Sequence, residues 1–164
     1  MVVIKLYNYH IMKKILFSLT LILGQIIVIA QCDNSCLPDG ISFFSQSSID
    51  DFQINYPGCT EIEGHVNIIG DNITNLNGLN LLTAIGGELK LNHTGALTDL
   101  NGLNLLQSIG GDFTINNADA LTNLVGLDNL QSIGGDFYID RSDSLVDLIG
   151  LNNLTSIGSN LQIG

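Results

Sequence analysis

A 24-residue unit that repeats without slippage constrains the fold of this chain more than any other feature. Ile-Gly-Gly begins at Ile85, Ile109 and Ile133, and Ile157 begins a fourth copy that reads Ile-Gly-Ser. A shorter, irregular copy covers residues 62–68. Periods of about 20 to 50 residues are typical of solenoids, in which each unit contacts only its neighbours. We therefore expect stacked coils rather than a globular core.

Each unit carries seven large apolar positions in three short groups. In the unit that begins at residue 113 they are Phe113, Ile115, Leu121, Leu124, Leu127, Leu130 and Ile133. The first group alternates as a strand does, and no group is long enough for an ordinary helix. Stacking brings equivalent side chains about 4.8 Å apart, and burying each contributes roughly 1.5 to 3 kcal/mol. The pattern predicts a mainly β fold, a right-handed β-helix or leucine-rich-repeat-like solenoid over residues 61–164.

Other repeated positions have structural roles in such a coil. One turn repeats a short polar side chain that can hydrogen-bond the backbone, at Asn80, Asn104, Asp128 and Asn152. The paired glycines are expected to supply corner dihedrals that residues with a Cβ avoid. We expect the residues at these positions to stabilise the fold and not to bind a ligand.

The start of the chain has the pattern of a secretory signal. Met12 is followed by two lysines, by an apolar run from Ile15 to Ile29 and by Ala30. These features predict a signal peptide at residues 12–30, and residues 1–11 would precede a misassigned start. The apolar run of 15 residues is shorter than the ~20 that span a bilayer, which disfavours a permanent anchor.

The net charge of the chain limits the kinds of partner that we expect it to bind. Cleavage after Ala30 would leave only Lys90 and Arg141 against all 16 acidic residues, a net charge of −14. This charge repels nucleic acid and anionic membranes, and favours a cationic partner, a divalent ion or a neutral glycan. The acidity is also explained by solubility alone. We expect membrane contact only through a missing C-terminal anchor or sorting domain.

Export makes the three cysteines, Cys32, Cys36 and Cys59, candidates for disulfide bonding. Lipidation of Cys32 is disfavoured because Gln31 stands where lipidation signals have a small residue. The sequence has no Cys-x-x-Cys pair and no His-rich set for zinc, so we expect no metal or cofactor.

Residues 31–60 are predicted to form a small N-terminal cap, which a solenoid needs to cover its first coil. Ile41–Phe43 is predicted as a short strand and residues 47–56 as a helix. Ser47, with Asp50 three residues later, is the expected N-cap, and Pro57 and Gly58 end the helix.

The ten residues from Cys59 to Ile68 resemble the opening of the receptor L domain, the ligand-binding module of insulin and epidermal growth factor receptors. The later Leu-x-x-Leu and Ile-Gly-Gly strings are similar to the coils of that family, including those of bacterial surface proteins exported by type IX secretion. The resemblance spans residues 36–164. It implies a disulfide between Cys36 and Cys59, with Cys32 left over. Receptor signalling does not carry over, because these residues include no kinase segment.

Three enzyme classes have partial support in the sequence or need to be excluded. Gly110–Phe113 and Gly134–Phe137 spell the Gly-Gly-Asp-Phe signature of diguanylate cyclases, but their 24-residue spacing in an exported chain indicates coil corners. A hydrolase with an activated nucleophile is disfavoured, because the sequence has no Gly-x-Ser-x-Gly motif to form a nucleophile elbow. A polysaccharide-active β-helix with clustered carboxylates stays open as an alternative, although basic residues are few. We expect the chain not to be an enzyme.

The strand after each Ile-Gly pair is expected to point alternate side chains outward, in two columns. The first column contains Glu88, Asp112, Asp136 and Asn160, and the second contains Lys90, Thr114, Tyr138 and Gln162. The first column is acidic or polar, and the second is varied, which favours specific recognition. The sequence predicts a secreted or cell-surface binding or adhesion module for an extracellular protein or glycan, with Glu88, Lys90, Asp112, Thr114, Asp136 and Tyr138 as its ligand face. A passive spacer that displays another domain is the main alternative.

The last copy ends in mid-coil at Leu161–Gly164. It would expose an apolar row that natural solenoids cover, made of Leu151, Leu154, Ile157, Leu161 and Ile163. We therefore expect the chain to be a piece of a longer protein.

Overall fold

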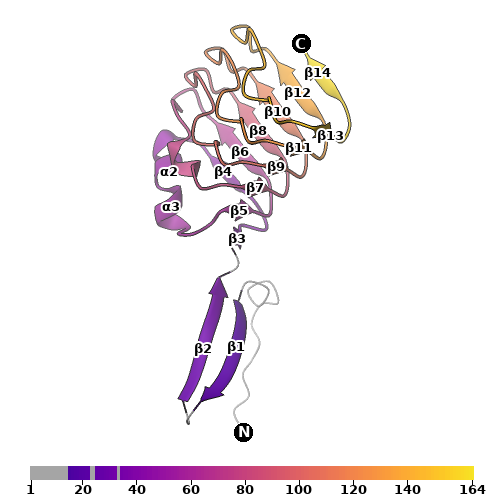
Figure 1. Ribbon diagram of the computed structural model, residues 1–164. Helices are drawn as coiled ribbons and strands as arrows, with labels where there is room; N and C mark the ends of the chain where they lie inside the picture. The colour runs from indigo at the N-terminus through magenta and orange to yellow at the C-terminus, as the bar shows by residue number, and fades with distance from the viewer. Residues whose placement is uncertain (1–14, 23–24, 33) are drawn as a thin grey trace.

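The computed structural model describes residues 15–22, 25–32 and 34–164, and shows a stack of coils with strands running along two sides (Figure 1). One parallel sheet contains β4 (Ile41–Phe43), β6 (Val66–Ile69), β8 (Leu89–Asn92), β10 (Phe113–Asn116), β12 (Phe137–Asp140) and β14 (Leu161–Ile163). The other contains β3 (Ser35–Cys36), β5 (Glu61–Ile62), β7 (Ala84–Ile85), β9 (Ser108–Ile109), β11 (Ser132–Ile133) and β13 (Ser156–Ile157). The predicted mainly β solenoid is confirmed.

The strand register follows the sequence period. Thr114 on β10 pairs with Lys90 on β8 and with Tyr138 on β12, each 24 residues away. Val66 pairs with Leu89, which confirms that the first copy is one residue shorter. Each side chain therefore lies beside its counterpart in the next coil.

The core is the stack of the predicted apolar positions. All seven positions of the unit that begins at Phe113 are 1% exposed or less. Within this core the rings of Phe113 and Phe137 stack with their centroids 4.9 Å apart. Ala118 is also fully buried, so the unit has a further inward position that its small side chain concealed.

The paired glycines serve packing and not dihedral freedom, so the predicted role was wrong. Neither Gly110 nor Gly134 has a positive φ. A Cβ on Gly134 would overlap the carbonyl oxygen of Gly110, and a Cβ on Gly110 would overlap that of Gly86. Glycine is required here because the backbones of successive coils touch.

The cap differs from its prediction in three respects. The strand Ile41–Phe43 is confirmed, but the helix is divided into α2 (Gln46–Asp50) and α3 (Phe52–Asn55). The N-cap is Ser45 and not Ser47, because the Ser45 side chain accepts the Ser48 N–H while the Ser45 N–H donates to Ser48 Oγ, both at 3.3 Å. This reciprocal pair stabilises the start of α2. Both sheets also begin inside the predicted cap, since β3 pairs with β5 and β4 pairs with β6.

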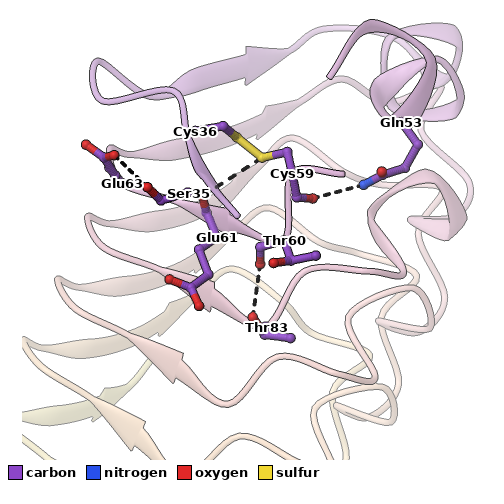
Figure 2. The surroundings of a disulfide bond; sticks show 8 residues. All are labelled: Ser35, Cys36, Gln53, Cys59, Thr60, Glu61, Glu63 and Thr83. Carbon is purple, nitrogen blue, oxygen red and sulfur yellow. Dashed lines mark hydrogen bonds between the residues drawn. A yellow bond between two sulfur atoms is a disulfide. The ribbon is translucent and has the colours of Figure 1, made fainter. Parts of the chain in front are cut away.

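A disulfide joins Cys36 on β3 to Cys59 just before β5, with a Cα–Cα distance of 5.8 Å (Figure 2). Nearby, Gln53 of α3 donates its Nε2 to the carbonyl oxygen of Cys59 at 3.1 Å, and Ser35 Oγ donates to Glu63 at 2.9 Å. The pairing of Cys36 with Cys59 is confirmed. The disulfide ties β3 to the start of the first full coil, and the Gln53 hydrogen bond ties α3 to the same place.

The strands β1 (Ile15–Ile22) and β2 (Gln25–Cys32) pair antiparallel in a sheet of their own. They lie within or next to the signal peptide expected at residues 12–30, whose cleavage remains a prediction. The expected misassigned start, residues 1–11, lies outside the described residues. In the described part of the chain, no helix has the length and apolar character needed to cross a membrane.

The last coil exposes apolar side chains whose counterparts are buried. Leu161 and Ile163 are 51% and 54% exposed, as expected, whereas Leu151, Leu154 and Ile157 are partly buried. Leu148, which was not in the expected row, is 36% exposed, although Leu124 one coil earlier is fully buried. The difference arises because no coil packs on Leu148.

Candidate functional site

The outward side of the sheet that contains β4 to β14, here called the outer face, carries three columns of side chains. Inward residues alternate with outward ones along each strand, so the outward positions of successive coils align. The first column is His65, Glu88, Asp112, Asp136 and Asn160. The second is Ser42, Asn67, Lys90, Thr114, Tyr138 and Gln162. The third is Ile69, Asn92, Asn116 and Asp140.

The six predicted face residues therefore lie in the first two columns. The third column was missed by sequence reasoning. It could have been found by extending the alternation of inward and outward residues by two more positions along the strand. This extension places Asn116 outward, two positions after Thr114. The outer face is thus wider than the predicted surface, and its added column is mostly polar.

The first column is a ladder of hydrogen bonds between coils. Asp112 Oδ1 accepts the N–H of Asp136, and Asp136 Oδ1 accepts the N–H of Asn160, both at 2.8 Å. At the start of the column, His65 Nδ1 accepts the N–H of Glu88 at 2.9 Å. Repulsion between stacked carboxylates is offset by these backbone amides, since charge-assisted hydrogen bonds are stronger than neutral ones. The column therefore helps to hold the coils together.

Asp136 is the carboxylate with the most hydrogen-bond donors around it. Hydrogen bonds from the Ser159 side chain, the Asn160 backbone and the Asn160 side chain lower the pKa of Asp136 below its usual value. These donors favour the charged form. Their contribution to stability is present above the usual carboxyl pKa and is lost as the pH falls through the lowered pKa. Asp136 is consequently an anion at neutral pH.

A hollow of about 220 Å³ opens on the outer face over β10, β12 and β14. Its lining consists of Asp112, Thr114, Asp136, Phe137, Tyr138, Asn160 and Gln162. Four of the six predicted face residues thus surround one depression, whereas Glu88 and Lys90 lie outside its lining. The geometry combines carboxylates, amides, a hydroxyl and a phenol ring in one place.

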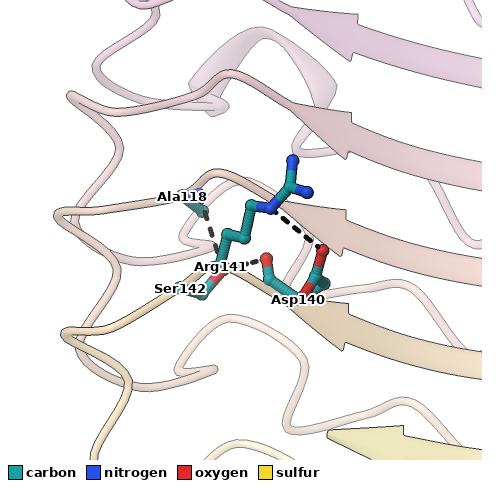
Figure 3. A network of polar contacts seen from close by, with 4 residues as sticks. All are labelled: Ala118, Asp140, Arg141 and Ser142. Carbon is teal, nitrogen blue, oxygen red and sulfur yellow. Dashed lines mark hydrogen bonds and ion pairs between the residues drawn. The ribbon is translucent and has the colours of Figure 1, made fainter. Parts of the chain in front are cut away.

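The third column ends in a small polar network at the end of β12 (Figure 3). Arg141 Nε lies 3.5 Å from Asp140 Oδ2, in an ion pair whose arginine is 71% exposed. Ser142 Oγ donates to the carbonyl oxygen of Asp140 at 3.2 Å and accepts the N–H of Ala118 at 3.4 Å. The network fixes the corner between coils, and it partly neutralises the charge of Asp140.

The described residues contain no group of three or more His, Cys, Asp or Glu side chains placed to hold a metal ion. The carboxylates of the first column lie in a line along the stack. Each of Asp112 and Asp136 uses one oxygen to accept a backbone amide of the next coil. The column as described is therefore a ladder of hydrogen bonds along the stack.

These features define a class of protein, the β-solenoid that presents one face of a parallel sheet to solvent. Residues 58–125 match the sequence model of the receptor L domain family, so this part of the chain is similar to receptor L domains. The match includes the first coils and the outer-face residues Glu88, Lys90, Asp112 and Thr114. This family is typically an extracellular ligand-binding module, which is consistent with a binding role. No curated protein matches the chain.

Proposed function

We propose that this chain is a secreted or cell-surface module that captures or adheres to an extracellular protein or glycan through its outer face. The observation that carries the proposal is the contrast between the first two columns. In the first, three of the five side chains, His65, Asp112 and Asp136, hydrogen-bond the next coil. The second changes chemistry at nearly every step, from Asn67 to Lys90, Thr114, Tyr138 and Gln162.

In the second column Asn67 hydrogen-bonds Ser42, whereas the four side chains that follow make no hydrogen bond within the described part of the fold. No protein group within the described residues hydrogen-bonds the side chains of Lys90, Thr114, Tyr138 or Gln162, and all four are partly or fully exposed. A spacer needs only soluble side chains at such positions, whereas a specific contact needs particular ones. Variation without a structural cause favours recognition.

Two further observations support an extracellular role. Disulfides persist mainly in oxidising compartments, and Cys36 and Cys59 form one. The receptor L domain match covers the part of the chain in which the outer face begins.

Thr114→Arg is expected to abolish binding, because it places a long charged side chain in the centre of the outer face, where association needs close packing. The purified protein would be tested on an array of immobilised glycans and extracellular proteins. Gln107→Arg is the matched control. Gln107 is an exposed residue of the same coil that lies directly before β9 and outside the outer face, and its substitution adds the same charge.

The control should bind like the unsubstituted protein, and both variants should melt within a few degrees of it. The proposal fails if the unsubstituted protein binds nothing on the array, or if Thr114→Arg binds as well as Gln107→Arg does.

A further inference from the structure

We propose that the hollow over β10, β12 and β14 binds a neutral saccharide, one ring at a time, against the side chain of Tyr138. This inference rests on the proposed function, because it takes the outer face as the binding surface and names the ligand class of the hollow on it.

The size of the hollow suits a single ring of a longer chain. Its volume of about 220 Å³ is below the ~300 to 1,000 Å³ of pockets that bury drug-sized molecules. Its lining comes from three successive coils, so it lies on an extended surface and is not a closed cavity. A polymer could pass over it while one of its units enters.

The lining offers both donors and acceptors of hydrogen bonds, as a polyhydroxylated ligand requires. Gln162 carries an amide group that donates and accepts, and Thr114 carries a hydroxyl that does both. Asn160 Nδ2 already donates to Asp136 and to Ser159, so Asn160 offers its Oδ1 as an acceptor. Asp112 uses only Oδ1 in the ladder, and its Oδ2 has no hydrogen-bond partner within the described residues. That oxygen can accept a hydrogen bond from a sugar hydroxyl.

Tyr138 supplies the apolar surface of the hollow. Its column neighbours Thr114 and Gln162 are polar, and its ring makes none of the aromatic contacts found among the described residues. A tyrosine ring offers a flat apolar body with a polar tip, which suits a ligand that has apolar C–H faces and polar edges.

The negative charge of the hollow favours some candidate ligands over others. The hollow contains two carboxylates, and the chain has a formal net charge of −11, so sulfated or uronic acid chains are repelled. A basic peptide would be attracted, but its charged side chains only donate hydrogen bonds, so they would not use the donors of Thr114 and Gln162. A neutral saccharide uses the carboxylates and the amides together.

The test measures binding of the purified protein to three immobilised probes: neutral oligosaccharides, sulfated oligosaccharides and lysine-rich peptides. We expect binding to at least one neutral oligosaccharide that changes little with salt, because no ion pair forms. Tyr138→Ala should weaken it by about tenfold or more, consistent with loss of a central aromatic contact.

The double variant Asp112→Asn/Asp136→Asn should also weaken binding by about tenfold, because hydrogen bonds to charged groups are the stronger ones. Asparagine keeps an Oδ1 that can accept the ladder amides, so the fold should persist. Asp119→Asn/Asp143→Asn is the matched control, with the same change of charge at two exposed aspartates 24 residues apart and outside the hollow.

Salt-sensitive binding to the lysine-rich peptides alone would overturn the saccharide inference and leave the proposed function standing. Binding to neutral oligosaccharides that survives both Tyr138→Ala and Asp112→Asn/Asp136→Asn would remove the hollow as the site. Failure of the unsubstituted protein to bind these probes or any member of the wider array would overturn both proposals.

Discussion

Replacing Phe113 with alanine should lower the free energy of unfolding by about 3 to 5 kcal/mol. Phe113 is fully buried at the middle of the stack, and its ring packs flat on that of Phe137. The cavity would open between two coils whose backbones are already in contact at Gly110 and Gly134, so the neighbouring coils have little freedom to close it.

Urea denaturation of the two proteins measures this loss. Phe44→Ala is the matched control, because Phe44 is 65% exposed and should change the free energy of unfolding by about 0.5 kcal/mol or less. A loss below about 1 kcal/mol for Phe113→Ala would mean that the phenylalanine ladder does not hold the coils together.

Removing the disulfide with Cys36→Ser/Cys59→Ser should cost about 2 to 4 kcal/mol. The bond closes a loop with a sequence separation of 23, so its loss releases conformational freedom in the unfolded chain. Cys59 is only 4% exposed, so a serine hydroxyl there would also be buried. The first coil, β3 and α3 should loosen together.

Thermal melting with and without reductant checks this result. Cys32→Ser is the control, and it should melt like the unsubstituted protein under both conditions. Equal destabilisation by Cys32→Ser would show that Cys32 takes part in the bond. A reductant-insensitive melting temperature in the unsubstituted protein would show that the bond contributes no stability.

The repeat predicted the stacking register because identical apolar rows can be buried together only in register. A slip of one residue would turn Phe113 and Ile115 outward, so the pairing of Thr114 with Lys90 and Tyr138 followed from the period alone. The second outer-face column could be read from the sequence for the same reason. The pairing of Cys36 with Cys59 followed from the family resemblance and not from the repeat.

Other features depend on distances that no one-dimensional pattern contains. The contact between Gly110 and Gly134 reflects how closely two corners approach, and sequence reasoning assigned these glycines to dihedral freedom instead. The amide that Asp112 accepts lies one coil away, so the structural role of the acidic column was visible only in three dimensions.

The N-cap was misplaced for a local reason. Three serines, Ser45, Ser47 and Ser48, lie close together, and each is a suitable capping residue. Ser45 is the N-cap because its backbone is extended, with φ −155° and ψ 158°, as is typical of N-cap residues. Composition alone does not distinguish among the three.

The most direct test of the central claim is photo-crosslinking from the outer face. A photoreactive phenylalanine analogue would replace Thr114 in one protein and Gln107 in another, and each would be irradiated with the ligand that the array identifies. We expect a covalent adduct from position 114 and none from position 107. Equal adducts from both positions, or an adduct from position 107 alone, would contradict recognition through the outer face.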